Sequence, residues 1–226
     1  MCNAYTLTHS RDAITELTRA MQLKPENELE EFEPRYRIGT KQRAPILIRQ
    51  DGRLLWRMAL WGLLSSAKKQ KYPLNNARAD KLNGWPWSAF LGNRCLAPAS
   101  GFFEPEKPAG SKVVAPWHYY SLANKEPFFM LGLWSETIDP ETGEVEISFT
   151  IVIIDANAAI REHNRMPATS IGAPVGDWVT KTSLPRDLLT PCAAEHIVGW
   201  RVGDAVKNSR TPNSPDLVRP VADQPM

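Results

Sequence analysis

The second residue of the chain is a cysteine, and that position gives it two nucleophiles. Removal of Met1 leaves Cys2 with a free α-amine beside its thiol. The amine has a pKa near ~7.7–8.0 and a free thiol titrates near ~8.5, so both have reactive forms at cellular pH. Such a 1,2-aminothiol reacts with an aldehyde, because the amine forms an imine and the thiol then closes a thiazolidine ring. Taken alone, a cysteine at position 2 is better explained by chance.

Three other segments place polar groups at the ends of apolar elements, where a scaffold presents a site. Residues Asn75–Arg78 follow Pro73-Leu74. Residues Arg94–Glu104 form an apolar run that ends on a carboxylate, and residues Glu162–Pro167 follow an apolar strand and a short predicted helix. These side chains transfer protons or bind phosphate, so the four segments together predict a chemical site.

The elements that position these segments are mostly short strands. Strand-like runs, separated by turn signals such as Gln50-Asp51-Gly52, cover residues 44–49, 54–61, 95–104, 116–122, 128–134 and 147–154. Helical patterns cover residues 10–22, about 76–91, 156–162 and 185–198. Strands with hairpin-length gaps predict an α+β fold, with an antiparallel β-sheet or barrel core and flanking helices.

Composition is that of an ordinary globular domain. The 226 residues are 42% hydrophobic and 23% charged, which excludes a wholly disordered chain. No apolar run approaches the ~18 residues that span a bilayer, and the first residues lack the features of a secretory signal. Cys2, Cys95 and Cys192 are too few and too widely spaced for a disulfide framework or a CxxC metal site. We therefore expect a cytoplasmic protein without a membrane segment.

The small net charge of +2 conceals two oppositely charged stretches. Residues 26–33 hold five glutamates, which we interpret as a solvated loop. Residues 36–82 hold eleven lysines and arginines against two aspartates, a net charge of +9. This stretch leaves room for a phosphate-binding face, although such residues can also scatter over several faces of a fold.

With these residues in hand, the chain resembles the SRAP (SOS response-associated peptidase) family. Six elements of the family pattern occur in order: Met1-Cys2, Tyr36–Thr40, Trp61-Gly62-Leu63, Asn76-Ala77-Arg78, Arg94–Glu104 and His163–Pro167. The resemblance covers about residues 1–220, and residues 221–226 are left as a C-terminal tail. It implies a single SRAP-like domain.

The chain departs from the family pattern at several positions. Arg37 and Thr40 replace an asparagine and a proline, and Asn3-Ala4 replaces Gly-Arg. Pro105 replaces the tryptophan that usually follows the glutamate. These changes affect the nucleic-acid surface more than the reactive centre.

The resemblance implies covalent capture of abasic sites in single-stranded DNA, whose ring-opened sugar carries an aldehyde. It assigns Cys2 as the nucleophile and Glu104 as the proton shuttle of imine formation and ring closure. It assigns Asn76 to hold the α-amine and His163 to assist opening of the sugar or to bind the adjacent phosphate. Each residue also has a structural interpretation: a turn or helix cap for Asn76, a surface glutamate at a strand end for Glu104, and a structural histidine for His163.

Arg78 and Arg165 are the candidate DNA-binding residues, because a guanidinium can bond two phosphate oxygens. Structural ion pairs are the alternative for both. His9, His118 and His196 match no motif and are interpreted as structural, while Trp61 and Cys95 are expected in the core.

Two alternative functions stay open. The family name implies a peptidase, in which the same residues remove Met1 in cis or cleave peptides in trans as an N-terminal-nucleophile enzyme. A non-catalytic single-strand binder would instead use the basic stretch alone. No metal or organic cofactor is implied, and we expect a monomer whose partner is single-stranded DNA.

Overall fold

The computed structural model describes residues 2–64, 73–106, 115–138, 142–161, 163–169, 171 and 174–221. Within them the chain forms two α-helices, twelve strands and six short 3-10 helices (η). In chain order these are β1 (Ala4–Leu7), α1 (Arg11–Ala20), β2 (Arg35–Gly39), β3 (Arg43–Gln50), β4 (Arg53–Trp61), β5 (Asn76–Arg78), η1 (Ala79–Lys81), η2 (Trp87–Phe90), β6 (Arg94–Ala99), β7 (Gly101–Pro105), β8 (Trp117–Leu122), β9 (Phe128–Ile138), β10 (Val145–Asp155), β11 (Arg165–Pro167), α2 (Gly176–Thr180), η3 (Arg186–Leu189), η4 (Ala194–His196), β12 (Ile197–Val202), η5 (Asp204–Lys207) and η6 (Pro215–Val218).

The strands form two sheets. Sheet A has five antiparallel strands in the order β12-β8-β7-β1-β2. Sheet B has seven strands, and five of them close into a ring, because β9 pairs with both β6 and β10 while β3 and β4 link β6 to β10. A closed ring removes the unpaired edges that an open sheet exposes. The expected α+β fold with a sheet or barrel core is confirmed.

Strand β10 organises the region around the candidate site. It pairs antiparallel with β9 and, at its end, with β11. On its other side it pairs parallel with β4 and then with β5. These two parallel pairings differ from the wholly antiparallel core that we expected, and they bring β5 and β11 to opposite sides of the same strand end.

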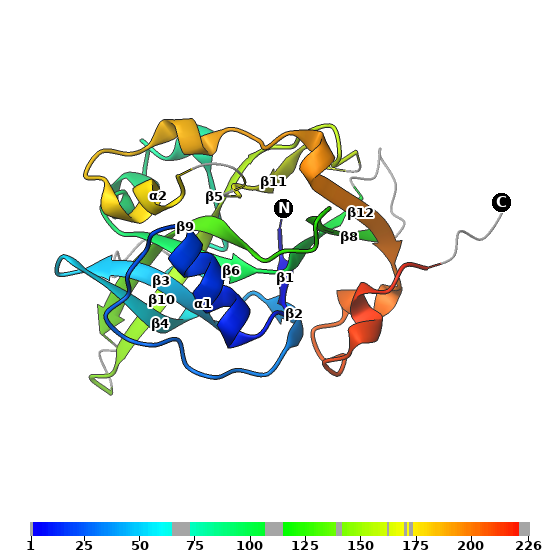
Figure 1. Cartoon of the computed structure of the whole chain (residues 1–226), viewed down its shortest axis with the longest axis horizontal. Helices are drawn as coiled ribbons and strands as arrows, with labels where there is room; N and C mark the ends of the chain where they lie inside the picture. Colours follow the sequence, from blue (N-terminus) through cyan, green and yellow to red (C-terminus); the bar gives the residue numbers. More distant parts are fainter. Residues whose placement is uncertain are drawn as a thin grey trace.

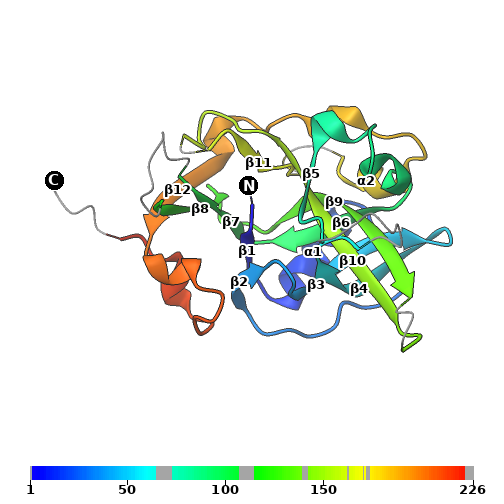
Figure 2. The same ribbon diagram turned by 180° about the vertical axis from the view of Figure 1, so that it is seen from behind.

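Strand β1 lies between the two halves of the molecule, with the N-terminus near the centre (Figures 1 and 2). Residues 95–104, expected as one strand, are instead divided at Ser100 into two strands. The first, β6, belongs to sheet B, and the second, β7, belongs to sheet A. The Ser100 hydroxyl accepts hydrogen bonds from the backbone of Thr8 and His9, so the crossover between the sheets is fixed to the N-terminal segment.

The core follows from continuous apolar runs in the strands, because β6 is buried along its whole length and β9 and β10 over most of theirs. Its largest fully buried side chains include Trp61, Trp178 and Tyr5, all in one cluster that joins both sheets. Helix α1 lies in front of β3 and β6 in Figure 1 and behind them in Figure 2. It confirms the helix predicted near residues 10–22: the Ser10 side chain caps its first turn, and Ile14 is buried.

Three of the predicted helices are wrong. Residues 76–91 contain β5 and two 3-10 helices, because Asn76–Arg78 pair with β10 and because Gly84 and Pro86 interrupt a helix. In the predicted helix 156–162, the Asn157 side chain accepts from the Ala159 backbone and stabilises a turn.

The predicted helix 185–198 is also replaced by other structure. It consists of η3 and η4, separated by Pro191, and then the start of β12. Strands β1, β2, β11 and β12 were not predicted. No helix within the described residues is long and apolar enough to cross a membrane.

Candidate functional site

Cys2 lies two residues before the first residue of the short strand β1, which is held between β7 and β2. Ala4 pairs with Phe103, so the chain direction carries Cys2 towards the end of β7, where Glu104 lies. Cys2 has 0% of its surface exposed. Burial, and then the nearby charge of Glu104, raise the pKa of the Cys2 thiol well above its ordinary value. The thiol is therefore protonated at rest and close enough to Glu104 to respond to its charge.

Glu104 is a fully buried carboxyl group on a central strand, not the surface residue of the alternative interpretation. Burial raises the pKa of Glu104 to about 7, because a charged carboxylate loses its hydration there. Both protonation states are therefore populated near neutral pH. A carboxyl group poised in this way can donate a proton in one step and accept one in the next.

Gly101 allows this strand to lie where it does. A Cβ atom at position 101 would lie 2.3 Å from the hydroxyl oxygen of Tyr119 and 2.5 Å from the carbonyl oxygen of Tyr120. The ring of Phe102 stacks on Tyr120, with ring centroids 5.5 Å apart. Close packing of β7 against β8 therefore depends on a glycine before the two phenylalanines, which explains the order Gly-Phe-Phe-Glu.

His163 lies beside Glu104, just before β11. Its Nδ1 atom is 3.8 Å from Oε2 of Glu104, and its side chain is 10% exposed. The same Nδ1 atom is 3.0 Å from both the backbone nitrogen and the backbone oxygen of Arg165. A neutral ring accepts from the Arg165 N–H, whereas a protonated ring donates to the Arg165 carbonyl or to Glu104. The site thus supports either state of His163.

Asn76 binds the backbone of the candidate nucleophile. Its Nδ2 atom donates to the carbonyl oxygen of Cys2 at 2.8 Å. Its Oδ1 atom is buried, and no hydrogen-bond partner for it occurs in the part of the chain that the structure describes. The contact with the α-amine implied by the resemblance stays a prediction, and Oδ1 is the atom that would accept from that amine.

The Trp61-Gly62-Leu63 motif fixes the segment that carries Asn76. The indole N–H of Trp61 donates to the carbonyl oxygen of Asn75 at 2.9 Å, and Trp61 is fully buried as expected. Gly62 has φ +132°, and a Cβ atom there would lie 2.8 Å from the Cβ atom of Pro73. Only glycine satisfies both the backbone angle and the space, so this motif positions Asn76 instead of reacting itself.

Arg78 and Arg165 lie on the two strands that flank the end of β10. Arg78 is opposite Ile153, and Arg165 is opposite Asp155. Both guanidinium groups make ion pairs: Arg78 with Asp80 at 2.7 Å, and Arg165 with Asp155 at 2.6 Å. Asp80 and Asp155 are exposed, and exposed pairs of this kind contribute little stability. The DNA-binding role of the two arginines stays a prediction.

The basic stretch 36–82 does not form one face within the described residues. Its arginines contact five different parts of the fold: Arg37 the carbonyl of Val206, Arg43 the side chain of Glu146, Arg49 the carbonyl of Thr180, Arg53 the side chain of Glu26 and Arg78 the side chain of Asp80. Lys68, Lys69 and Lys71 lie outside the described residues. A binder that relies on this stretch alone is therefore poorly supported.

His118, interpreted from the sequence as structural, lies on β8 directly opposite Glu104, and its Nε2 atom is 3.9 Å from Oε1 of Glu106. No motif surrounds it, and its place depends on the register between β7 and β8, which the sequence does not specify. His9, by contrast, is structural as expected, with its ring nitrogens 2.7 Å from the Ser100 hydroxyl and 2.9 Å from the Lys125 carbonyl.

The other two cysteines are not near the site. Cys95 is fully buried on β6, which confirms its place in the core. Cys192 is half-buried and contacts the side-chain amide of Asn157. Among the described side chains, no group of three or more His, Cys, Asp or Glu residues is arranged to hold a metal ion.

Comparison with known proteins agrees with this geometry. The family described as SOS response associated peptidase (SRAP) matches residues 1–209. The abasic site processing protein HMCES of Xenopus tropicalis is 27% identical over 84% of this chain and 67% of its own length. The HMCES protein of Pongo abelii is 25% identical over 98% of this chain and 76% of its own length.

Solved structures share the fold. A crystal structure of a Bacteroides thetaiotaomicron protein covers 98% of this chain and 100% of its own, with a TM-score of 0.77 and 22% identity. A Bordetella bronchiseptica protein covers 89% of this chain and 100% of its own, with a TM-score of 0.69 and 21% identity. At these identities the likeness concerns the fold alone.

Proposed function

The chain belongs to the SOS response associated peptidase (SRAP) family, and from this membership we propose that it captures abasic sites in single-stranded DNA through Cys2. The relatives named as abasic site processing proteins support this substrate class. The observation that carries the proposal is the convergence of Cys2, Asn76, Glu104 and His163 from four separate segments. Asn76 donates to the Cys2 carbonyl oxygen, and the charge of Glu104 adds to burial in raising the pKa of the Cys2 thiol. The Nδ1 atom of His163 lies 3.8 Å from Oε2 of Glu104.

The reaction begins at the α-amine that removal of Met1 exposes. Because burial keeps the Cys2 thiol protonated, the neutral amine is the stronger nucleophile at the start. Its nitrogen attacks the C1′ aldehyde carbon of the open sugar and forms a carbinolamine. The protonated Glu104 donates to the departing hydroxyl, water leaves, and a protonated imine remains.

Ring closure uses the same carboxyl group in the opposite direction. The Glu104 carboxylate, having lost its proton, accepts the proton of the Cys2 thiol as sulfur attacks the imine carbon. The product is a thiazolidine in which one sugar carbon is bonded to both the nitrogen and the sulfur of Cys2. A pKa of about 7 suits Glu104 to both steps at neutral pH.

His163 is assigned to the sugar and Asn76 to the nucleophile. An imidazole beside Glu104 can protonate the ring oxygen of the closed sugar and so favour the aldehyde form. Asn76 holds the Cys2 carbonyl and offers its buried Oδ1 atom to the amine, which fixes the direction of attack. Arg78 and Arg165 exchange their exposed carboxylate partners for phosphates of the flanking strand.

The experiment that tests the proposal is a denaturing-gel assay with a single-stranded oligonucleotide that contains one abasic site. The wild type forms a covalent adduct, and Cys2→Ala forms none. Cys95→Ala and Cys192→Ala are matched controls that retain the adduct, because both residues lie away from the site. Salt-sensitive binding with no adduct from any variant would contradict the proposal and favour a non-covalent single-strand binder.

The family description favours a second activity, that of a peptidase. In this function the Cys2 sulfur attacks the Met1 carbonyl carbon, and Glu104 carries the thiol proton to the departing Cys2 nitrogen as the Met1–Cys2 amide bond breaks. Water then hydrolyses the resulting thioester and releases methionine. We expect Glu104→Gln to retain Met1 if this removal is autocatalytic, when the protein is made by translation that lacks methionine aminopeptidase. Complete removal of Met1 in that variant would contradict self-processing. Cys2-dependent turnover of peptides added in trans would support a wider peptidase function.

A further inference from the structure

When the α-amine starts as an ammonium group and Glu104 starts protonated, one proton must leave the buried site before the amine can attack. At neutral pH much of the α-amine is an ammonium group, since its pKa is near ~7.7–8.0. One ammonium, one thiol and one aldehyde combine to give one thiazolidine, one water and one proton. Glu104 has 0% of its surface exposed, so it cannot pass this proton directly to bulk water.

A second histidine faces Glu104 across the strand pair. In the β7–β8 register Glu104 is the direct partner of His118. Directly opposed residues in an antiparallel pair have Cβ atoms about 4.5–5.5 Å apart and point to the same face of the sheet. The two side chains are therefore neighbours on one face of sheet A, and one water between the imidazole and the carboxyl group would connect them.

From His118 the path continues outward to a carboxylate in contact with solvent. The Nε2 atom of His118 lies 3.9 Å from Oε1 of Glu106, and the exposed fraction of the side chains rises from 0% at Glu104 to 13% at His118 and 40% at Glu106. The backbone of Glu106 bonds to Pro116, which extends the strand pairing and holds Glu106 beside His118. The ring of Tyr120 lies against His118 with centroids 6.3 Å apart.

We propose that His118 and Glu106 carry protons between buried Glu104 and solvent, a relay that rests on the proposed crosslinking function. A proton on Glu104 passes to one ring nitrogen of His118, the other nitrogen releases its proton to Glu106 or water, and the ring then turns or exchanges tautomer. His163 is assigned to the sugar in the proposed function, and its Nδ1 atom also contacts the backbone of Arg165. His118 acts through Glu104 and does not contact the substrate.

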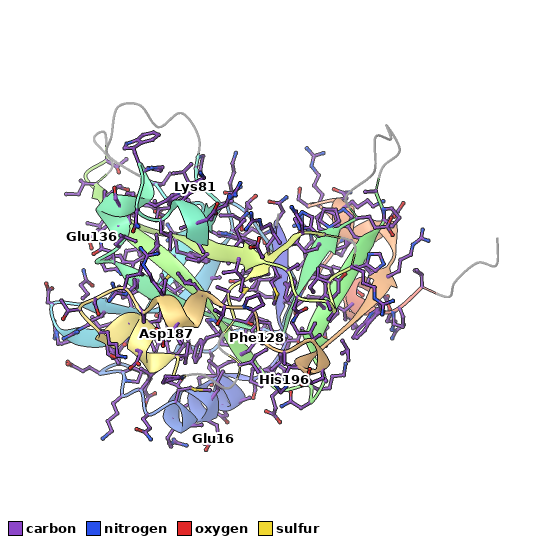
Figure 3. The ribbon with its side chains drawn as sticks, turned by 90° about the horizontal axis from the view of Figure 1, so that it is seen from above. Glu16, Lys81, Phe128, Glu136, Asp187 and His196 are labelled. Carbon is purple, nitrogen blue, oxygen red and sulfur yellow. The ribbon has the colours of Figure 1, made fainter. Side chains whose placement is uncertain are left out.

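The test compares crosslinking rates under single-turnover conditions with saturating abasic oligonucleotide. His118→Gln and Glu106→Gln should crosslink more slowly, by roughly 10-fold for His118→Gln, which is less than the ~100-fold or more expected from loss of the general acid–base itself. Affinity for an oligonucleotide with a tetrahydrofuran abasic analogue, which has no aldehyde, should be unchanged. His196→Gln is the matched control, because His196 is exposed on η4 (Figure 3). Its backbone pairs with Ala123, just beyond the end of β8 that is farther from His118.

Chemical rescue separates a relay from a structural role. In His118→Ala, added imidazole should restore the crosslinking rate in a concentration-dependent way, without changing the thermal unfolding midpoint or the affinity for the tetrahydrofuran analogue. An unchanged rate in His118→Gln would overturn the relay. Slow crosslinking that imidazole does not restore would also overturn it. If the wild type itself forms no adduct, the proposed function fails, which is a distinct result.

Discussion

Glu104 combines a chemical advantage with an electrostatic cost. Its ordinary pKa of 4.5 rises to about 7 in the folded protein, because burial disfavours the charged form. The folded state therefore holds a proton that the unfolded state loses between pH 4.5 and pH 7. The stability that depends on this proton is fully present below pH 4.5 and is lost as the pH rises towards 7. A shift of this size corresponds to about 3 kcal/mol.

Glu104→Gln should remove this pH dependence, because glutamine keeps the shape of the side chain and never becomes charged. Relative to the wild type, its free energy of unfolding should increase by up to about 3 kcal/mol between pH 4.5 and pH 8. The measurement is urea unfolding at several pH values, and Glu195→Gln, at an exposed position, is the control. A constant difference across this range would show that Glu104 is not held at a raised pKa.

Arg78 and Arg165 should contribute to DNA affinity through charge alone. Each alanine variant loses one phosphate contact, so the slope of log affinity against log salt concentration should fall by about 0.7 for single-stranded DNA. Fluorescence anisotropy with the tetrahydrofuran oligonucleotide measures this slope. Arg19→Ala is the control, since Arg19 pairs with Glu16 on the exposed side of α1. An unchanged slope in both site variants would show that the DNA strand does not bind at Arg78 and Arg165.

Short elements, and not long ones, position the site. Cys2 precedes the four-residue strand β1. Asn76 and Arg165 each begin a three-residue strand that pairs with β10. Such strands are marginal on their own and persist because their neighbours hold them. Substitutions that move a neighbouring segment should therefore reduce activity without touching a reactive group.

Gly62→Ala tests this dependence. The new Cβ atom would lie 2.8 Å from the Cβ atom of Pro73, and the alanine would have to keep the backbone at φ +132°. The segment that carries Asn76 therefore has to move. Gly52→Ala is the matched control, because Gly52 also has positive φ (+81°) but has nothing within 4 Å of its Cβ position. We expect Gly52→Ala to cost about 1 kcal/mol of unfolding free energy and Gly62→Ala clearly more, with slower crosslinking only in Gly62→Ala. Equal effects on both measurements would contradict the positioning role of Gly62.

The contrast between motif and element shows what the sequence could supply. Cys2, Asn76, Glu104 and His163 were identified because they occur in distinctive motifs, and the structure brings all four together. The predicted helix 76–91 failed because Asn76–Arg78 are paired with β10, a contact 75 residues away that no local pattern records. The position of His118 opposite Glu104 could not be predicted for the same reason, since it depends on the register between β7 and β8.

At the scale of the whole molecule, the candidate site residues lie where two sheets meet. Strand β1 belongs to sheet A, while β5 and β11, the strands of Asn76 and Arg165, belong to sheet B (Figure 1). His163 lies two residues before the start of β11. The positive charges that are close together in the sequence of residues 36–82 lie on different parts of the fold. Some are paired with acidic residues distant in the sequence, as Arg53 is with Glu26 and Arg43 with Glu146. Affinity for DNA should therefore come from the few arginines at the β10 end, and the expectation of a monomer stays a prediction.

Intact-mass spectrometry of the purified protein, with and without an abasic oligonucleotide, tests the central claim most directly. Alone, the wild type should have the mass of the chain without Met1. With the oligonucleotide, it should have the sum of the two masses less one water, as a thiazolidine requires. Adduct formation by Cys2→Ala, or no adduct from a wild type that has lost Met1, would contradict the proposed capture of abasic sites through Cys2.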